Sequence, residues 1–541
     1  MATRTSQQSA FVNGNFITLD DARPRARAAV AVDGRFALVG DTPAALAAVG
    51  AGSAVYDLRG AVVVPGFVDA HAHPASFGLG ITDLDLSRSA SVRDVLERIR
   101  SRAGDLMPGE WLPAHGYDQS LLAERRHPTL EELDAACPMN PLYVRHASGH
   151  LCLANSIALR MAGLDSQDPA TCDGLGRDPG TGRPNGVLYG TAQALVRRLR
   201  LPHPRDELRR ALAIAGSEMA RRGVTSCHDA WHGRLAPWEI DAYREALEEG
   251  LLKARVCLMP AGAPGGHGFG PADSGGGSFR WDTGDDRAFD DRLKIGPPKF
   301  FVDGSITAGT AAFSGRSAYA VPAGVNRAEI RAMVAALERG HRVAAHAVGD
   351  VAVEAAVAAI ERSSRARRGH RMEHCGMAGP GAIHRMARLG IVVVTQPSFV
   401  SEKGDVYAEV LGDDGARRLF PVRSLLAGGV TVAFGTDLPA SAATPIQQIH
   451  DAVNRLTASG QSLGDDERIS ARQALWCLTV GGACASLEAH AKGRIREGMY
   501  ADMTVLSDDP TRVSPGGIGD IEVIATVVGG MPVFSAPALG W

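Results

Sequence analysis

The chain has 541 residues, 45% of them hydrophobic, and a formal net charge of −3. This length exceeds one average domain and supports a large core, while the small charge argues against nucleic acid or an anionic membrane as a partner. No apolar run is long enough for a transmembrane helix. The eight cysteines form no CxxC pair, and the segment MATRTSQQSA lacks the apolar region of a secretory signal. We therefore expect reduced thiols and a cytoplasmic protein.

Both ends of the chain read as short strands separated by turns. Near the N-terminus, apolar runs flank an Asn-Gly pair at 13–14 and an Asp-Gly pair at 33–34, and such pairs are hairpin signals. The C-terminal segment alternates apolar runs with glycine-rich turns in the same way. We expect residues 1–60 and 485–541 to form one small composite β domain, with residues 61–484 as the main domain.

The stretch VVVPGFVDAHAHP begins with an apolar run that predicts a buried strand over 62–68, and it continues to His71 and His73. Residues two apart in an extended segment point to the same side, so both imidazoles face one space. Imidazole nitrogen suits zinc and similar divalent ions. An HxH pair alone is a weak signal, because surface and structural histidines are common.

Residues 78–210 read as a mostly helical insertion with loops. Within it, the segment RHASGH carries Arg145, His146 and His150. These residues belong either to a surface turn or to a loop that faces a substrate.

From about residue 207, amphipathic helices alternate with short apolar runs, which is typical of parallel βα units. Together with the HxH strand, eight strands are predicted: 62–68, 224–228, 254–259, 298–302, 343–346, 371–374, 391–396 and 431–436. Eight such units favour a (β/α)8 TIM barrel over an open sheet. A nucleotide-binding open sheet would also need a glycine-rich phosphate loop after its first strand, and the sequence has none there.

Polar residues at the carboxyl ends of these strands form a set, because barrel strands end at one common mouth. The rule selects six residues: His71, His73, Lys299, His346, His374 and Asp437. Four imidazoles and a carboxylate predict a divalent metal site that suits zinc best, with manganese, iron and cobalt compatible. His228 also ends a strand, and we leave it outside the ligand set.

Lys299 needs a separate explanation, because a protonated ammonium repels a metal ion. A lysine carbamylated by carbon dioxide is an anionic carboxylate that can bridge two cations about 3.5–4 Å apart. A salt-bridged or substrate-binding lysine is the alternative. The sequence leaves open whether one or two metal ions bind per chain.

Several other residues near strand ends have two interpretations. Trp231, Phe301 and Phe399 form either an apolar pocket wall or simply core. Gln396 is a candidate for a hydrogen bond to a ligand side chain.

The sequence resembles the amidohydrolase superfamily and, within it, the amidohydrolase 3 (YtcJ-like) group, which includes N-substituted formamide deformylases. The resemblance rests on ordered motifs along nearly the whole chain: PGFVDAHAH (65–73), RHASGHLCLANSIAL (145–159), KFFVDGS (299–305), AHAVGDVAV (345–353), RMEHC (371–375), TQPSF (395–399), FGTDLP (434–439) and GMYADMTVL (498–506). It implies a TIM barrel with a composite β-sandwich, the six metal ligands named above with Lys299 carbamylated, and a homodimer.

Two positions depart from the pattern of that group. Gly190 stands where an acidic residue is common, and Gly309 stands where an arginine is common. Both changes remove charge near the expected pocket, and we interpret them as altered substrate preference.

These features predict hydrolysis of an amide-type bond, N-acyl or N-formyl, in a small molecule by metal-activated water. Asp437 is the expected general base and then acid, and His150 and Arg145 are candidate donors to the oxyanion. A deaminase or cyclic-amide hydrolase of the same superfamily is the alternative, and ammonia release from a heterocycle would identify it. A non-catalytic scaffold on this fold is a third possibility, but its signature, the loss of ligands, is not seen in the sequence.

Overall fold

The computed structural model describes residues 8–50, 52–119, 121–146, 151–165, 174–189, 192–262, 289–307, 309–315, 324–363 and 368–541. The chain divides into two compact units. The larger comprises residues 1–74, 212–234 and 240–541, and the smaller comprises residues 75–211 and 235–239. Among the described helices, none combines the length and apolar character needed to cross a bilayer.

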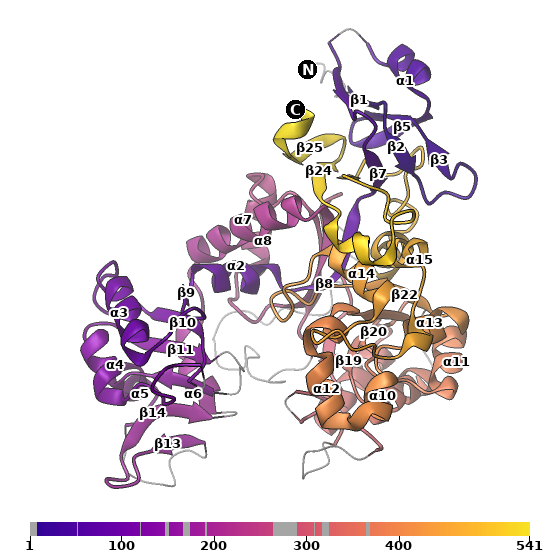
Figure 1. Cartoon of the computed structure of the whole chain (residues 1–541). Helices are drawn as coiled ribbons and strands as arrows, with labels where there is room; N and C mark the ends of the chain where they lie inside the picture. The colour runs from indigo at the N-terminus through magenta and orange to yellow at the C-terminus, as the bar shows by residue number, and fades with distance from the viewer. Residues whose placement is uncertain are drawn as a thin grey trace. The chain divides into compact units, whose positions relative to one another are not determined.

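The α-helices are labelled in chain order in Figure 1. Their bounds are α1 Thr42–Ala48, α2 Pro74–Thr82, α3 Val92–Ala103, α4 Leu130–Ala136, α5 Ser156–Met161, α6 Gln193–Arg197, α7 Arg205–Arg221, α8 Glu239–Glu248, α9 Arg327–Glu338, α10 Asp350–Arg362, α11 Pro380–Leu389, α12 Ser398–Arg417, α13 Val422–Ala427, α14 Pro445–Asn454, α15 Ala471–Trp476 and α16 Gly482–Ala485.

Strands from the two ends of the chain share a sheet in the larger unit, where indigo and yellow segments meet in Figure 1. Its order is β25 (Met531–Ser535), β24 (Val523–Val528), β23 (Met503–Leu506), β7 (Val62–Pro65), β2 (Asn15–Ile17) and β3 (Arg25–Ala26). A second sheet has the order β5 (Arg35–Gly40), β4 (Ala28–Val32), β1 (Gln8–Val12) and β6 (Ala54–Asp57). Apolar side chains from both sheets, including Phe11, Phe36 and Val505, form one buried cluster.

Two parallel sheets form the centre of the larger unit. One has the order β17 (Leu293–Ile295), β16 (Arg255–Pro260), β15 (Val224–His232) and β8 (Phe67–Ala72). The other has the order β18 (Lys299–Phe301), β19 (Ala344–Ala347), β20 (Arg371–His374), β21 (Val392–Thr395) and β22 (Thr431–Phe434). Helices α9, α10 and α13 pack against the second sheet. Of these, α10 and α13 are labelled beside it in Figure 1. The fold is of the predicted mixed α/β class.

Backbone contacts join the two parallel sheets at both seams. Ala261, just after β16, forms a parallel bridge with Lys299, and the amide of Gly262 donates to the Lys299 carbonyl at 2.7 Å. At the other seam, the Asp437 amide donates to the His71 carbonyl at 2.7 Å, and the His73 amide donates to the Leu438 carbonyl at 2.8 Å. The segments that carry His71 and Asp437 are therefore held side by side.

The strand predicted over 62–68 is in fact parts of two strands. β7 pairs with β2 and β23 of the terminal sheet, whereas β8 pairs with β15 of the parallel sheet. Gly66 separates them, and a Cβ atom there would lie only 2.1 Å from the Thr225 hydroxyl oxygen. The prediction of one strand was wrong because the Pro65-Gly66 bend between the two apolar runs does not show on its own that the second run joins another sheet.

The insertion was predicted to be mostly helical, and this prediction was wrong. It contains a six-stranded sheet, which lies in the smaller unit. Its order is β13 (Leu175–Arg177), β14 (Pro184–Tyr189), β12 (Leu151–Ala154), β11 (Leu142–His146), β10 (Leu112–Tyr117) and β9 (Leu84–Asp85). These strands have only two to six residues each, so the periodic helices between them dominated the sequence pattern. Helix α4 begins at a capping box formed by Thr129 and Glu132.

Candidate metal centre

The structure brings predicted ligands from the ends of four strands, β8, β19, β20 and β22, into one cluster. The Nε2 atoms of His73 and His71 lie 3.2 Å and 3.5 Å from Oδ1 of Asp437. One ligand atom each from His71, His374 and Asp437 lie within 4.8 Å of one another. The ring of His346 lies 4.5 Å from that of His374, centroid to centroid. These spacings leave the donor atoms close enough to share one or two cations.

The backbone around the cluster is tightly constrained. A side chain at position 435 is excluded, because a Cβ on Gly435 would lie 2.5 Å from the His71 nitrogen. The Asp69 carboxylate accepts from the Thr436 amide at 2.9 Å and from its hydroxyl at 2.6 Å. His374 and Asp437 have positive φ angles of 68° and 59°. Such conformations are costly for residues other than glycine, and they gather at functional sites.

Each imidazole of the cluster has an acceptor near one of its ring nitrogens. Nδ1 of His71 lies 2.6 Å from Oε2 of Glu373, and Nδ1 of His374 lies 2.7 Å from Oε1 of Gln396. Nε2 of His346 lies 2.9 Å from the Gly304 carbonyl oxygen. His73 is held more loosely, since its Nδ1 is 3.7 Å from Asp229. A ligating histidine commonly has such an outer partner, which leaves the other ring nitrogen for the metal.

The electrostatics of the site favour neutral imidazoles. Burial lowers the pKa of His71 to about 4 and that of His374 to about 3, and it lowers the pKa of His346 well below the usual range. For His73, burial acts in the same direction, but the carboxylates of Asp229 and Asp437 outweigh it and raise the pKa. Neutral imidazole is the form that binds a metal ion.

The two remaining predicted ligands are an ionised carboxylate and a buried amine. Burial acts to raise the pKa of Asp437, but the surrounding imidazoles, with His71 first, hold it well below its usual range. Burial lowers the pKa of Lys299 to about 8. In the described part of the chain Lys299 forms no ion pair, and Glu373 and Asp437 are the anionic groups that act on it. Imidazole and carboxylate donors together fit a divalent ion such as zinc, manganese, iron or cobalt.

The other candidates from the sequence lie elsewhere or have other partners. Arg145 lies on β11 of the smaller unit with an exposed side chain, and His150 falls outside the described residues. His228 is fully buried, and its Nδ1 lies 2.9 Å from the guanidinium of Arg371. Phe301 lies against a ligand, with its ring centroid 5.0 Å from that of His346. Two glycines differ from the residues common at their positions in the family group. Gly309 adopts a φ of 65°, and Gly190 lies outside the described residues.

Four residues near the ligands escaped sequence reasoning in this role: Asp69, Asp229, Arg371 and Glu373. Each lies on a predicted strand or directly after one, so the same strand-end rule could have drawn attention to them. Strand periodicity alone does not separate side chains that face the predicted ligands from side chains that face the core.

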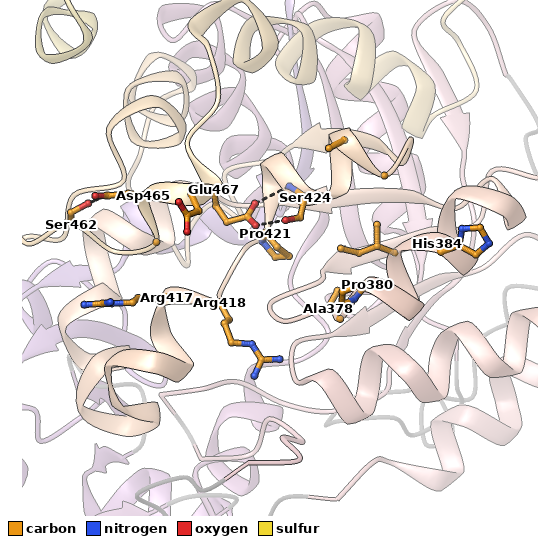
Figure 2. A pocket seen from close by; sticks show the side chains of 16 residues that line it. Ala378, Pro380, His384, Arg417, Arg418, Pro421, Ser424, Ser462, Asp465 and Glu467 are labelled. Carbon is orange, nitrogen blue, oxygen red and sulfur yellow. Dashed lines mark hydrogen bonds between the residues drawn. The ribbon is translucent and has the colours of Figure 1, made fainter.

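A cavity of about 960 Å³ lies in the larger unit, away from the ligands. Figure 2 shows its wall, with Arg417 and Arg418 from the end of α12 and Glu467 from a 3₁₀ turn. Glu467 is engaged by Ser424, whose amide donates to its carboxylate at 2.9 Å. None of the six predicted ligands lines this cavity, so it is separate from the metal cluster.

Comparison with known sequences identifies the family. A sequence model of the amidohydrolase family matches residues 54–534. The chain belongs to the amidohydrolase family. An N-substituted formamide deformylase of Arthrobacter pascens is 30% identical to this amidohydrolase over 96% of the chain and 97% of the relative. The protein YtcJ of Bacillus subtilis (strain 168) is 28% identical over 88% of the chain and 90% of the relative.

A solved structure agrees with this assignment. An uncharacterised metal-dependent hydrolase from Pyrococcus furiosus superposes on this amidohydrolase with a TM-score of 0.77 and 25% identity. The match covers 93% of the chain and all of the neighbour. The predicted family and the predicted class of reaction, metal-dependent hydrolysis of a carbon–nitrogen bond, are confirmed.

Proposed function

We propose that this amidohydrolase hydrolyses the N-formyl or N-acyl amide bond of a small molecule. The observation that carries the proposal is the convergence of the Asp437 carboxylate with the Nε2 atoms of His71 and His73 at 3.2–3.5 Å. A carboxylate so placed can serve both as a ligand and as a proton carrier. The relative of Arthrobacter pascens, named as a formamide deformylase, supports the N-formyl class.

We assign His71, His73, His346, His374, Asp437 and carbamylated Lys299 to one or two divalent metal ions, zinc first. When bound, the metal supplies a water of lowered pKa and polarises the scissile carbonyl. Carbamylation requires a neutral amine, and the buried, unpaired state of Lys299 supports it.

Within this chain, Asp437 moves the proton. Its carboxylate accepts a proton from the attacking water and then delivers it to the nitrogen of the leaving amine, so one residue is base and acid in turn. Glu373, Gln396 and the Gly304 carbonyl hold the rings of their histidines in place. His150 and Arg145 remain proposed donors to the oxyanion.

We also infer that the two parallel sheets are halves of one (β/α)8 barrel, with β17 and β18 sharing one barrel position. The hydrogen bonds at both seams support this closure. The proposed domains are a β-sandwich from residues 1–60 and 485–541 and a barrel domain over 61–484. Sheet pairing between strands from the two chain ends supports the first of these.

The proposed setting is a cytoplasmic homodimer that acts on a small molecule without nucleic acid or a membrane. The seven described cysteines are unpaired, which fits a reducing compartment. Light scattering coupled to size-exclusion chromatography would test the dimer.

The decisive experiment is product analysis with a panel of N-substituted formamides and N-acyl amines, using metal-loaded enzyme. Formate or carboxylate release, together with the free amine, would support the proposal. Release of ammonia from heterocyclic amines, without turnover of the amides, would replace it with the deaminase alternative. No turnover of any carbon–nitrogen bond by metal-loaded protein would instead favour the scaffold alternative.

A further inference from the structure

A buried chain of three charged or polar side chains runs behind His71. Glu373, Arg371 and His228 are each fully buried. The Arg371 guanidinium donates from Nε to Oε1 of Glu373 at 2.7 Å and from Nη2 to Oε2 at 3.0 Å. Oε2 of Glu373 in turn lies 2.6 Å from Nδ1 of His71. Arg371 is the donor and Glu373 the acceptor in these contacts, because arginine has no acceptor and an ionised carboxylate has no donor.

We propose that Glu373, held by Arg371, is the positioning residue that fixes His71 with a proton on Nδ1 and with Nε2 directed at the metal. The inference rests on the metal centre proposed above. A carboxylate accepts from Nδ1–H, so the unprotonated nitrogen must be Nε2. That atom lies 3.5 Å from Asp437. The chain thereby selects the tautomer in which His71 can be a ligand.

Arg371 also links Glu373 to the strand that carries His71. Its Nη2 donates to the carbonyl of Ala70, the residue before His71, at 2.6 Å. Its Nη1 lies 2.9 Å from Nδ1 of His228, which therefore accepts the hydrogen bond. The guanidinium is engaged on three sides, so it cannot turn away from Glu373. A lysine, with one ammonium, could not reproduce this planar arrangement.

The outer hydrogen-bond partner of His71 differs from the partners of the other three imidazoles of the cluster. The outer partner of His374 is the neutral amide of Gln396, and that of His346 is a backbone carbonyl. The carboxylate next to His73 is 3.7 Å away, beyond hydrogen-bond distance. Within the described residues, only His71 of these four has a carboxylate from outside the predicted ligand set at hydrogen-bond distance, because the carboxylate 3.2 Å from Nε2 of His73 is that of the predicted ligand Asp437. A carboxylate partner raises the basicity of the ligating nitrogen more than a neutral acceptor does.

The test compares metal affinity in wild type and Glu373→Gln by competition with a chelator, using zinc and then cobalt. Mutation of an outer partner of a ligating histidine typically lowers metal affinity about 10–100-fold, and we expect a loss in this range because the amide of Gln carries no charge. The absorption spectrum of the bound cobalt should also change, because the carboxylate that raises the basicity of the His71 ring is lost. Glu373→Asp, which keeps the carboxylate, should recover part of the affinity.

The matched control is Asp502→Asn. Asp502 also forms a buried pair with Arg255, with distances of 2.7 Å and 3.1 Å, but it touches no predicted ligand. Both substitutions remove the charge from a buried arginine–carboxylate pair, so both should lower thermal stability. Only the change at Glu373 should lower metal affinity and alter the cobalt spectrum.

Affinity and spectrum equal to wild type in folded Glu373→Gln would overturn the proposal, and so would an equal loss of affinity in the Asp502 control. If Glu373→Gln does not fold, Arg371→Lys and Glu373→Asp carry the same comparison, with affinity expected to fall in the first more than in the second. Equal affinity in these two variants and in wild type would also refute it. Wild-type protein that binds no metal would refute the metal centre itself, which is a distinguishable result.

Discussion

Replacing Asp437 by Asn tests the proton carrier most directly. The substitution keeps the size and shape of the side chain but removes its charge and its ability to take a proton. In the wild type, Oδ1 of Asp437 faces two imidazole nitrogens at 3.2 Å and 3.5 Å. We expect the variant to retain metal at saturating concentration, because the histidines and Lys299 remain, and to lose nearly all turnover.

The size of the loss follows from the surroundings of Asp437. General acid–base catalysis contributes about 10²–10⁴-fold, which corresponds to about 3–5 kcal/mol of barrier. The neighbouring carboxylates cannot take over: Asp69 is engaged by Thr436, and Glu373 by Arg371. We therefore expect kcat to fall by about 10³-fold or more, towards the upper end of that range.

The assay is steady-state hydrolysis of the best amide from the substrate panel, with metal content measured on the same samples. Asp465→Asn is a suitable control, because that carboxylate is exposed at the cavity of Figure 2, away from the ligands. Full activity of Asp437→Asn with full metal content would show that another group carries the proton.

Three further outcomes are expected. Dialysis against EDTA should abolish activity, and zinc, manganese, iron or cobalt should restore it; a metal-free protein with full activity would remove the metal from the mechanism. Gly435→Ala should lower the free energy of unfolding by about 1–3 kcal/mol and reduce metal content, because its Cβ would meet the His71 backbone. Gly381→Ala, which meets nothing within 4 Å, is its control, and equal melting temperatures would contradict the close contact. Burial lowers the pKa of His370 from 6.5 to about 4, so the unfolded chain binds a proton there at pH values where the folded chain does not. Wild type should therefore lose stability as the pH falls from about 6.5 to about 4, by about 2 kcal/mol between pH 7 and 5 from this residue. In His370→Asn this pH-dependent loss of stability should vanish, because Asn has no proton to bind but can still accept from the Val343 amide. The free energy of unfolding, measured with denaturant at pH 7 and pH 5, would fall equally in the variant and the wild type if the reasoning fails.

The cluster of ligands could be anticipated from the sequence because parallel strands end at one edge. His346 and Asp437 follow short apolar runs, and His374 ends the fully buried strand β20, so each lies at a strand end that the sequence predicts. Carbamylation was one of two alternatives for Lys299 from its chemistry alone, and the family resemblance favoured it. What the pattern could not supply was the direction of each side chain around the ligands. Glu373 and Arg371 alternate with buried neighbours, and only the fold shows that both face His71.

The two errors about elements have related causes. Val62 to Val64 and Phe67 to Val68 are equally apolar, and nothing in their composition separates a strand of the terminal sheet from a strand of the parallel sheet. The sheet of the smaller unit is built from runs of two to six residues, which are too short for periodicity to distinguish from loops. In both cases the structure of a segment depends on the strand with which it pairs, and the residues of the segment itself do not identify that strand.

The pairing of β7 with β23 has a consequence for synthesis on the ribosome. β7 leads directly into the strand that carries His71, yet one of its two neighbours is encoded about 440 residues later. At about 5–20 residues per second, the nascent chain waits roughly 20–90 s before that neighbour is translated. Throughout this interval the HxH segment has emerged, but β23, which pairs with β7, has not yet been translated. A truncation that removes the last strands would therefore harm a centre built largely from residues translated long before them.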